Sequence, residues 1–450
     1  MRRLLPPFFL LLPLLAAGCF SERSFEMVPA QLVRMPAGQS LSTREWATRM
    51  HALAADKLPA DRRDGVTTDQ LKEGDVPLNV WQRFHLEPTE LDSIFTNLHG
   101  IEQSAQVSSP PPVMENGHVK RTLWVGFQAV QVPVGKDQFL FGIMGTPEPD
   151  REIPGSFIIL THGLFGSLDG YDIENHAQAL RRAGHHVLAI EMRGHGETRC
   201  EHPEYAITFG VRESGDLLAT TDWLRATHGA MRVGLVCFSL TGYESLLTAW
   251  LDGRHAVEEF AGMPLLQELP AHRERAAFDA GMFVVSAPVG IMGVTKDFEH
   301  RYSALDGPVK ASFQDRVAQR LHDYGDPAGF SMWDLSRAEL MRSGLMAKPI
   351  EFDVAKPDFL RFIDMSADHW RVGAARMENV RVPLLVLSAA NDPLATGQSV
   401  ADLFALQGNP NIGVVLLKEG GHMGFSALSA DYYYSLMVNF FDPKTAPRTE

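Results

Sequence analysis

The alternation of strand-like and helix-like segments after residue 121 limits the possible folds of this chain most strongly. Apolar runs predict buried strands in FIILTHG, HVLAIEMRGHG and MRVGLVCFS. Segments with apolar residues at helical spacing separate these runs, and the first of them, YDIENHAQALRRAG, ends at Gly184. Strands that alternate with helices form a mostly parallel sheet that is covered on both faces. We therefore expect an α/β fold whose central sheet is flanked by helices.

The predicted domain has a hairpin at its start and a long insertion near its end. The strands TLWVGFQAVQVPV and DQFLFGIMG, separated by Gly135 and Lys136, predict a β-hairpin. The alternation pauses over residues 289–380 and resumes with VPLLVLSAANDP. About ninety residues are too many for a plain connection between two elements of one sheet. We interpret 289–380 as a helical cap, inserted before the strand that ends in Asp392. It would cover the carboxyl edge of the sheet, where ligands bind in such folds.

Three residues of the types that acyl transfer requires stand at the ends of predicted strands. Ser239 and Asp392 end the runs VGLVCFS and VPLLVLSAAND, and His422 follows VVLLKEGG. A serine hydroxyl is a poor nucleophile unless a histidine accepts its proton, and the imidazolium then needs a carboxylate. We therefore predict a catalytic triad. Each residue alone also has a structural interpretation: a turn residue for Ser239, a helix cap for Asp392 and a loop residue for His422.

A fourth part of the predicted site is THGLFGS (161–167), which follows the apolar run FIIL. The tetrahedral intermediate of acyl transfer needs backbone N–H donors that point at its oxyanion. The residue after the nucleophile, Leu240, supplies one donor in this prediction, and Leu164 supplies the other. Gly163 is expected to let the backbone turn there. We interpret His162 as support for the loop rather than as a catalytic residue.

These segments together resemble the α/β-hydrolase superfamily, and within it the YheT-type, embryogenesis-associated branch of esterase-like proteins. The resemblance rests on HGLFGS, EMRGHGET, the turn VCFSLTG, NDPLA and GGHMGF. IEFDVAKPDFLRF, in the predicted cap, also resembles a segment that this branch carries shortly before the acid-bearing strand. The resemblance covers about residues 121–442 and implies an α/β-hydrolase fold with Ser239, Asp392 and His422 as its triad. The chain departs from the branch at Asn391, where the branch usually has aspartate.

The turn around Ser239 also departs from the family pattern G-x-S-x-G. Cys237 and Thr241 stand in place of the two glycines. These positions must be small because strand and helix pass close on either side of a strained serine. Cysteine fits a buried site, whereas threonine is β-branched and fits less well, and Gly242 offers relief next to it. We expect a working turn that is tighter than usual.

The first nineteen residues, MRRLLPPFFLLLPLLAAGC, predict export from the cytoplasm. Two arginines, an apolar run and small residues before Cys19 form the pattern of a secretory signal peptide. Residues 15–19 also resemble the lipobox of bacterial lipoproteins, and Phe20 resembles the sorting residue of outer-membrane lipoproteins. We expect removal of residues 1–18 and a lipid anchor at Cys19 in the bacterial cell envelope, which membrane fractionation of a Cys19→Ala variant tests. Without lipidation the protein would be periplasmic or secreted.

Composition limits the partners and cofactors. Lys and Arg number 41 and Asp and Glu 55, which gives a net charge of −14 without a basic run, so we exclude nucleic acid as a partner. After removal of residues 1–18 only Cys200 and Cys237 remain, too few for a disulfide framework. No cluster has convincing metal-ligand spacing, and we expect no metal and no other cofactor. Residues 19–120 are expected to wrap the surface or tether the domain, and 443–450 form a short tail.

The predicted site indicates a serine hydrolase. We expect it to cleave carboxylic esters, with lipid or medium-chain acyl esters as substrates, through an acyl-enzyme on Ser239. Two alternatives use the same fold. An acyltransferase or a peptidase would share the triad and differ in the acceptor or in the scissile bond. A non-catalytic envelope binding protein would keep the fold without the activity, and the altered turn around Ser239 is the feature that favours it.

Overall fold

The computed structural model describes residues 31–63, 65–70, 114–115, 117–119, 121, 123–254, 269–270, 273–289, 298, 300–301, 308–348, 351, 359, 362–363, 370–395, 397–405 and 407–449. The predicted signal peptide and Cys19 lie outside these residues, so both stay predictions. None of the helices in the described part of the chain has the length and the apolar character that crossing a membrane requires.

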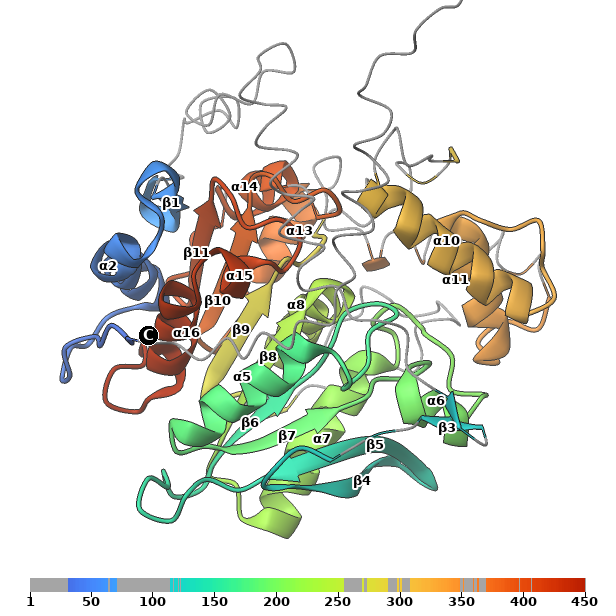
Figure 1. Cartoon of the computed structure of the whole chain (residues 1–450), viewed down its shortest axis with the longest axis horizontal. Coiled ribbons are helices and arrows are strands. Elements are labelled where there is room, and N and C mark those ends of the chain that lie inside the picture. Colours follow the sequence, from blue (N-terminus) through green and yellow to red (C-terminus); the bar gives the residue numbers. More distant parts are fainter. Residues whose placement is uncertain are drawn as a thin grey trace, which may run out of the picture.

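One sheet organises the described residues. Its nine strands are β1 (Gly65–Thr67), β4 (Phe127–Gly135), β5 (Gln138–Gly145), β6 (Ser156–Leu160), β7 (His186–Ile190), β8 (Arg232–Phe238), β9 (Gly281–Val285), β10 (Leu384–Ala389) and β11 (Ile412–Leu417). They are arranged in the order β1–β11–β10–β9–β8–β6–β7–β5–β4 (Figure 1). All pairs from β7 to β11 are parallel, whereas β4–β5, β5–β7 and β1–β11 are antiparallel. The predicted mostly parallel sheet is confirmed, and so is the hairpin, now β4–β5.

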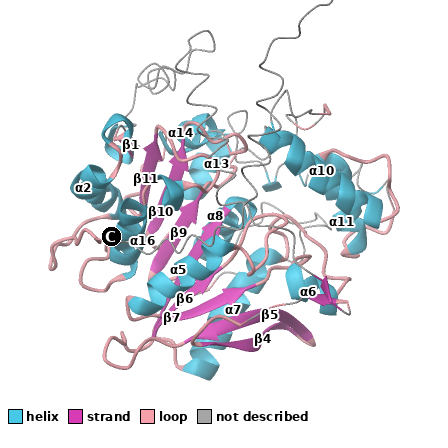
Figure 2. Ribbon diagram, viewed as in Figure 1, coloured by secondary structure: helices cyan, strands magenta, loops and turns pink. Residues whose placement is uncertain are grey.

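Helices cover both faces of this sheet (Figure 2). One face carries α2 (Thr43–Ala54), α5 (Tyr171–Arg182) and α16 (Ala430–Phe441). The other face carries α7 (Glu213–His228), α8 (Ser239–Gly253), α13 (Trp370–Met377) and α14 (Gly397–Ala405). Shorter elements are α6 (Gly196–Glu201), α15 (Phe425–Leu428), the two-residue strands β2 (Met114–Glu115) and β3 (His118–Val119), and 3-10 turns at Ala55–Lys57, Ala60–Arg62 and Thr68–Gln70.

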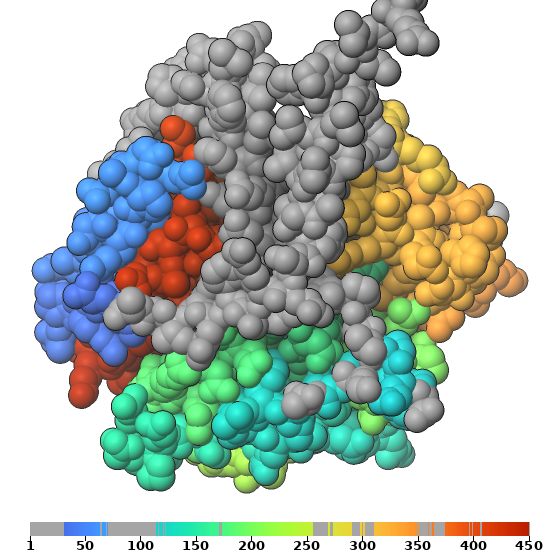
Figure 3. Space-filling model, viewed as in Figure 1, coloured from blue at the N-terminus to red at the C-terminus, as the bar shows by residue number. Residues whose placement is uncertain are grey.

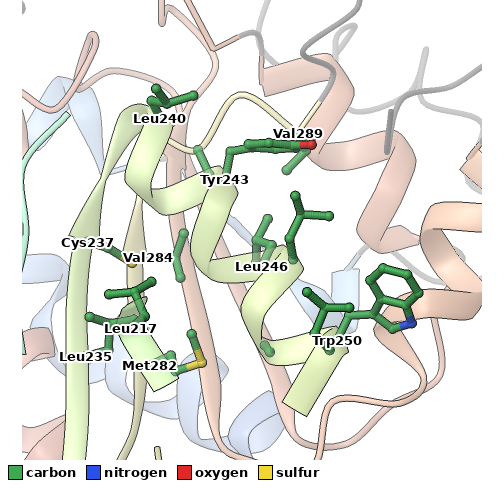
Figure 4. Packing of buried hydrophobic residues seen from close by; sticks show 14 of the residues in the cluster. Leu217, Leu235, Cys237, Leu240, Tyr243, Leu246, Trp250, Met282, Val284 and Val289 are labelled. Atoms are coloured by element: carbon green, nitrogen blue, oxygen red, sulfur yellow. The ribbon is translucent and has the colours of Figure 1, made fainter. Parts of the chain in front are cut away.

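Each central strand contributes to two hydrophobic cores. In β8, Leu235 and Cys237 pack into the core beneath α7 and α8, which Figure 4 shows. The intervening residues Val236 and Phe238 pack into the core beneath α5 and α16. Side chains alternate between the two faces of a strand, so a strand that is buried on both faces must be apolar throughout. This explains why the central strands are continuous apolar runs in the sequence.

The segment from residue 31 to residue 70 is part of this architecture rather than a separate tether. β1 extends the sheet beyond β11, and α2 packs on the same strand. Trp46 of α2 is 1% exposed and donates its indole N–H to the Thr445 carbonyl oxygen at 2.7 Å. Figure 3 shows this segment, in blue, against the C-terminal part of the chain, in red. The hydrolase domain therefore begins before residue 121, and a three-residue strand such as β1 leaves little periodicity that the sequence could show.

The insertion between β9 and β10 is helical, as predicted. Its two longest described helices are α10 (Pro308–Asp323) and α11 (Met332–Arg342), drawn in orange in Figure 1. Arg320 of α10 forms a buried ion pair with Glu339 of α11 at 2.6 Å. Arg320 also donates to the Gly194 carbonyl oxygen at 2.6 Å, and Glu339 accepts from the Ile207 N–H at 3.0 Å. These bonds attach the cap to the loops that follow β7.

Candidate active site

Ser239 stands at the junction between β8 and α8. Its φ of 51° lies in the left-handed region, which residues other than glycine rarely adopt. The N-cap residue Phe238 makes no side-chain capping bond, and the first N–H groups of a helix have no acceptor within the helix. Leu240, which Figure 4 shows at the start of α8, therefore has an N–H at the positive end of the helix. This placement suits a donor for a developing oxyanion.

The residues around Ser239 explain how the turn tolerates its missing glycines. Cys237 is buried and its thiol donates to the Ser245 hydroxyl at 3.0 Å. A Cβ atom on Gly242 would lie 3.2 Å from the Ala287 Cβ atom, so α8 packs tightly against the end of the neighbouring strand β9 at Gly242. Thr241 lies on a different side, where its hydroxyl donates to the His162 carbonyl oxygen. The expected crowding is thus met by Gly242, and Thr241 fits as a hydrogen-bonded residue.

The structure brings the three predicted triad residues together. The Oγ atom of Ser239 lies 2.8 Å from Nε2 of His422. Nδ1 of His422 lies 3.0 Å from each carboxylate oxygen of Asp392. Asp392 is 5% exposed, and its Oδ1 atom also accepts from the N–H groups of Leu394 and Ala395 at 2.8 Å each. A carboxylate at Nδ1 holds the imidazole with a free lone pair on Nε2, which can accept the serine proton.

Two polar side chains that the sequence did not single out as functional hold the histidine loop. Asn391 accepts from the Gly421 N–H at 2.9 Å. Ser286, which directly follows β9, accepts from the Met423 N–H at 3.0 Å. Ser286 and Met423 have φ angles of 51° and 69°, so both are held in the left-handed region on either side of this bond. The only sequence signal for Ser286 is a serine at the end of the apolar run MFVVS.

The loop 161–167 passes directly over Ser239. A Cβ atom on Gly163 would lie 3.0 Å from the Ser239 Cβ atom and 3.5 Å from its Oγ atom. The backbone turns at Gly163, whose carbonyl oxygen accepts from the Gly166 N–H, but the left-handed conformation in this turn is taken by Phe165, at 59°, and not by the glycine. Glycine is needed at position 163 because a larger residue would press on the nucleophile.

The backbone of this loop is fixed by hydrogen bonds to successive carbonyl groups. The Gly163 carbonyl oxygen accepts from the Gly166 N–H at 2.9 Å and lies 2.8 Å from Nδ1 of His162. A trans peptide group directs its C=O and N–H in opposite directions. The Leu164 N–H therefore points away from the imidazole of His162, and its role as the second oxyanion donor stays a prediction.

His162 supports the loop in its neutral form. Its Nε2 atom accepts from the Met192 N–H at 3.2 Å, so Nδ1 carries the proton that is donated to the Gly163 carbonyl oxygen. Burial lowers the pKa of His162 to about 4. The neighbouring ring of His195, 4.8 Å away, is also buried, and its pKa is held well below the usual value.

The described residues give no sign of a metal centre. No group of three or more His, Cys, Asp and Glu side chains among them could hold a metal ion. Within the same part of the chain, Cys200 and Cys237 are free thiols.

A comparison with protein families decides which family this arrangement represents. The model of the alpha/beta hydrolase family matches residues 158–432, which include every predicted site residue apart from Cys19. The chain belongs to the alpha/beta hydrolase family. This membership confirms the predicted α/β-hydrolase fold, while the resemblance of this hydrolase-family chain to the YheT-type branch stays a prediction.

Solved structures similar to this alpha/beta hydrolase family member include two archaeal proteins and one bacterial protein. The esterase Pf2001 of Pyrococcus furiosus is 16% identical, with a TM-score of 0.46 over 75% of this chain and 100% of that chain. The acylaminoacyl peptidase of Pyrococcus horikoshii is 14% identical, with a TM-score of 0.43 over 72% and 42%. XC6422 of Xanthomonas campestris, a serine hydrolase without a lid, is 17% identical, with a TM-score of 0.38 over 74% and 100%. These likenesses carry no information about the activity of this chain. A comparison with curated proteins finds no match.

Proposed function

We propose that this protein is a serine hydrolase that cleaves carboxylic esters through an acyl-enzyme on Ser239. The observation that carries this proposal is the continuous hydrogen-bonded path from Ser239 through His422 to Asp392, with lengths of 2.8 Å and 3.0 Å. A nucleophile, a base and a carboxylate that orients the base are the components that acyl transfer requires.

The geometry supports a two-step reaction. His422 accepts the proton of Ser239 at Nε2 while Oγ attacks the ester carbonyl carbon, and Asp392 stabilises the imidazolium. The N–H groups of Leu240 and Leu164 donate to the oxyanion of the tetrahedral intermediate. His422 then gives its proton to the leaving alcohol, which leaves an acyl group on Ser239. In the second step His422 activates a water molecule that releases the acid.

The surroundings of the loop 161–167 favour an apolar acyl group. Phe165 is partly buried and its ring centroid lies 5.7 Å from that of Phe313 in α10. Phe313 in turn lies 5.1 Å from Phe298. These aromatic side chains form an apolar wall between the proposed oxyanion loop and the cap. This apolar wall, on the loop that passes over Ser239, supports lipid or medium-chain acyl esters as substrates.

The alternatives from the sequence are separable by chemistry. The altered turn around Ser239 is the feature that favours a non-catalytic binding protein, but Ser239 in this turn lies 2.8 Å from Nε2 of His422. An acyltransferase or a peptidase would use the same triad. Product analysis with competing alcohols and amines distinguishes them from an esterase, because a transferase forms new esters and a peptidase cleaves amides.

Replacing Ser239 with alanine tests the proposal. We expect ester hydrolysis to fall by at least about 10³-fold and labelling by a fluorophosphonate probe to disappear. A matched control is Ser388→Ala, because Ser388 is a buried strand serine whose hydroxyl has no partner among the described residues. Assays with acetate, octanoate and palmitate esters rank the acyl chain length. A folded wild-type protein that neither reacts with the probe nor hydrolyses any of these esters would contradict the proposal.

A further inference from the structure

The hydroxyl of Thr241 bridges the two parts of the site that the family pattern leaves separate. Thr241 is 3% exposed, lies two residues after Ser239 and donates to the carbonyl oxygen of His162. Glycine, which the family pattern has at this position, has no side chain that could make this bond. Resting on the proposed function, we propose that Thr241 is a positioning residue that fixes the loop 161–167, and with it the oxyanion donor, relative to Ser239.

The direction of this hydrogen bond follows from the place of Thr241 in α8. A buried threonine inside a helix usually donates to the carbonyl four residues earlier, as Thr248 does to Glu244 at 2.7 Å in the same helix. Thr241 is only the third residue of α8, and the residue four positions earlier, Cys237, belongs to β8. Its hydroxyl is therefore available to another element.

The element that receives this bond is set by the sheet. β6 and β8 are parallel neighbours, so their carboxyl ends lie at the same edge. The loop after β6 begins beside the turn after β8, although His162 and Thr241 are 79 residues apart in the chain. A hydroxyl at position 241 thus meets the first carbonyl groups of the loop beyond β6.

This bond completes the fixation of the loop. Two successive carbonyl groups are held: that of His162 by Thr241, and that of Gly163 by His162 and Gly166. Each held carbonyl fixes the plane of its peptide group, and the second plane contains the N–H of Leu164. An oxyanion donor must lie about 2.7–3.1 Å from the oxyanion, so a small shift of the loop weakens transition-state stabilisation.

The test compares one variant without the hydroxyl with one that keeps it. Thr241→Val keeps the shape and removes the donor, whereas Thr241→Ser keeps the donor. We expect Thr241→Val to lower kcat about 10-fold to 100-fold with KM nearly unchanged, and to slow fluorophosphonate labelling in parallel. Thr241→Ser is expected to stay within about threefold of the wild type. The matched control is Thr248→Val, which removes a buried hydroxyl bond of the same helix away from the loop and should lower the melting temperature without lowering kcat.

A second substrate separates positioning from a general loss of structure. A thionoester places sulfur, a weaker hydrogen-bond acceptor than oxygen, at the oxyanion position. If Thr241 acts through the oxyanion donor, the loss caused by Thr241→Val should be smaller for the thionoester than for the matching ester. An equal loss for both substrates would overturn the inference.

The remaining outcomes also decide the question. Thr241→Val with wild-type kcat would overturn the inference while leaving the proposed esterase activity intact. A wild-type protein without activity or labelling would instead contradict the proposed function. If Thr241→Val does not fold, Thr241→Ala, which is smaller, gives the same comparison with Thr241→Ser.

Discussion

Two halves of the site meet at Ser239. In the side-chain half, His422 contacts Ser239 and Asp392 contacts His422, whereas in the backbone half the loop 161–167 approaches Ser239 through its main chain. In the side-chain half, the imidazole of His422 lies 2.8 Å from the Ser239 hydroxyl and 3.0 Å from the Asp392 carboxylate. In the backbone half, the side chains of His162 and Thr241 hold the carbonyl groups of Gly163 and His162 in place. The proposed function of the side-chain half therefore depends on which residues supply the reacting groups, whereas that of the backbone half depends on the groups that position the loop.

The two halves of the site also differ in what supports them. The histidine loop is held from within the sheet edge by Asn391 and Ser286. The loop 161–167 instead carries Phe165, whose left-handed backbone is costly for a bulky residue. The centroid of its ring lies 5.7 Å from the ring centroid of Phe313 and 5.8 Å from Cζ of Arg320, and both of these residues belong to α10. The cap thus touches the proposed oxyanion side, and its packing supports the strained residue there.

The largest expected effect comes from breaking the side-chain half. Asp392→Asn should lower kcat on the order of 10³-fold to 10⁴-fold with little change in KM. An amide beside Nδ1 favours the wrong tautomer of His422, so Nε2 no longer accepts the serine proton. Steady-state ester kinetics and the rate of fluorophosphonate labelling measure this loss.

The control for this prediction is an aspartate away from the site. Asp150→Asn alters an exposed residue in the turn after β5 and should keep wild-type kinetics. Wild-type kcat in Asp392→Asn would show that the carboxylate does not orient His422, and the side-chain half would then need another acid.

A smaller effect is expected from breaking the backbone half. Gly163→Ala places a methyl group 3.0 Å from the Ser239 Cβ atom, so the loop or the nucleophile must move. We expect kcat to fall about 10-fold to 100-fold, because one weakened oxyanion donor has an effect of about this size or larger. Steady-state kinetics and probe labelling measure the change.

Gly215→Ala is the matched control for the backbone half. A Cβ atom there meets nothing within 4 Å, and Gly215 lies inside α7, where alanine is favoured by roughly 0.5–1 kcal/mol. The control should be fully active and slightly more stable. A Gly163→Ala protein as active as this control would mean that the loop does not need its close approach to Ser239.

The same contrast explains what the sequence could reveal about the site. Ser239, Asp392 and His422 were predictable because each has a reactive side chain at the end of an apolar run. The bond of Thr241 to His162 was not, because it joins residues 79 apart that meet only once β6 and β8 are neighbours. Ser286 was missed for the same reason, since its function depends on a loop far along the chain.

The fold shows a similar division between local pattern and tertiary contact. The hairpin β4–β5 and the apolar central strands were predictable from turn residues and long apolar runs. β1 was not, because it is only three residues long and is recognised as a strand through its pairing with β11, far along the chain. The sequence also could not show why position 163 is glycine. The residue needs clearance above Ser239, and this clearance depends on how the loop after β6 sits relative to the turn after β8.

The smallest expected effect on kcat at neutral pH comes from replacing His162, which holds the loop of the backbone half. Protonated His162 could not accept the Met192 N–H, and burial lowers its pKa to about 4, whereas the unfolded chain titrates near 6.5. The unfolded state therefore binds the proton first. Stability from this residue is fully present above about pH 6.5 and is lost as the pH falls to about 4, by about 3 kcal/mol in total. Urea unfolding of His162→Gln should show a shallower loss of stability over this range.

The control is a second buried histidine that lies away from Ser239. His185 lies 2.9 Å from the Ser156 hydroxyl through Nδ1, and burial lowers its pKa to about 3. His185→Gln should flatten the pH dependence of stability in the same way while leaving kcat at pH 7 unchanged. His162→Gln should flatten it and also lower kcat severalfold, because the Gly163 carbonyl loses its donor. Equal kcat in the two variants would separate the loop from catalysis and leave only the side-chain half as the functional part of the site.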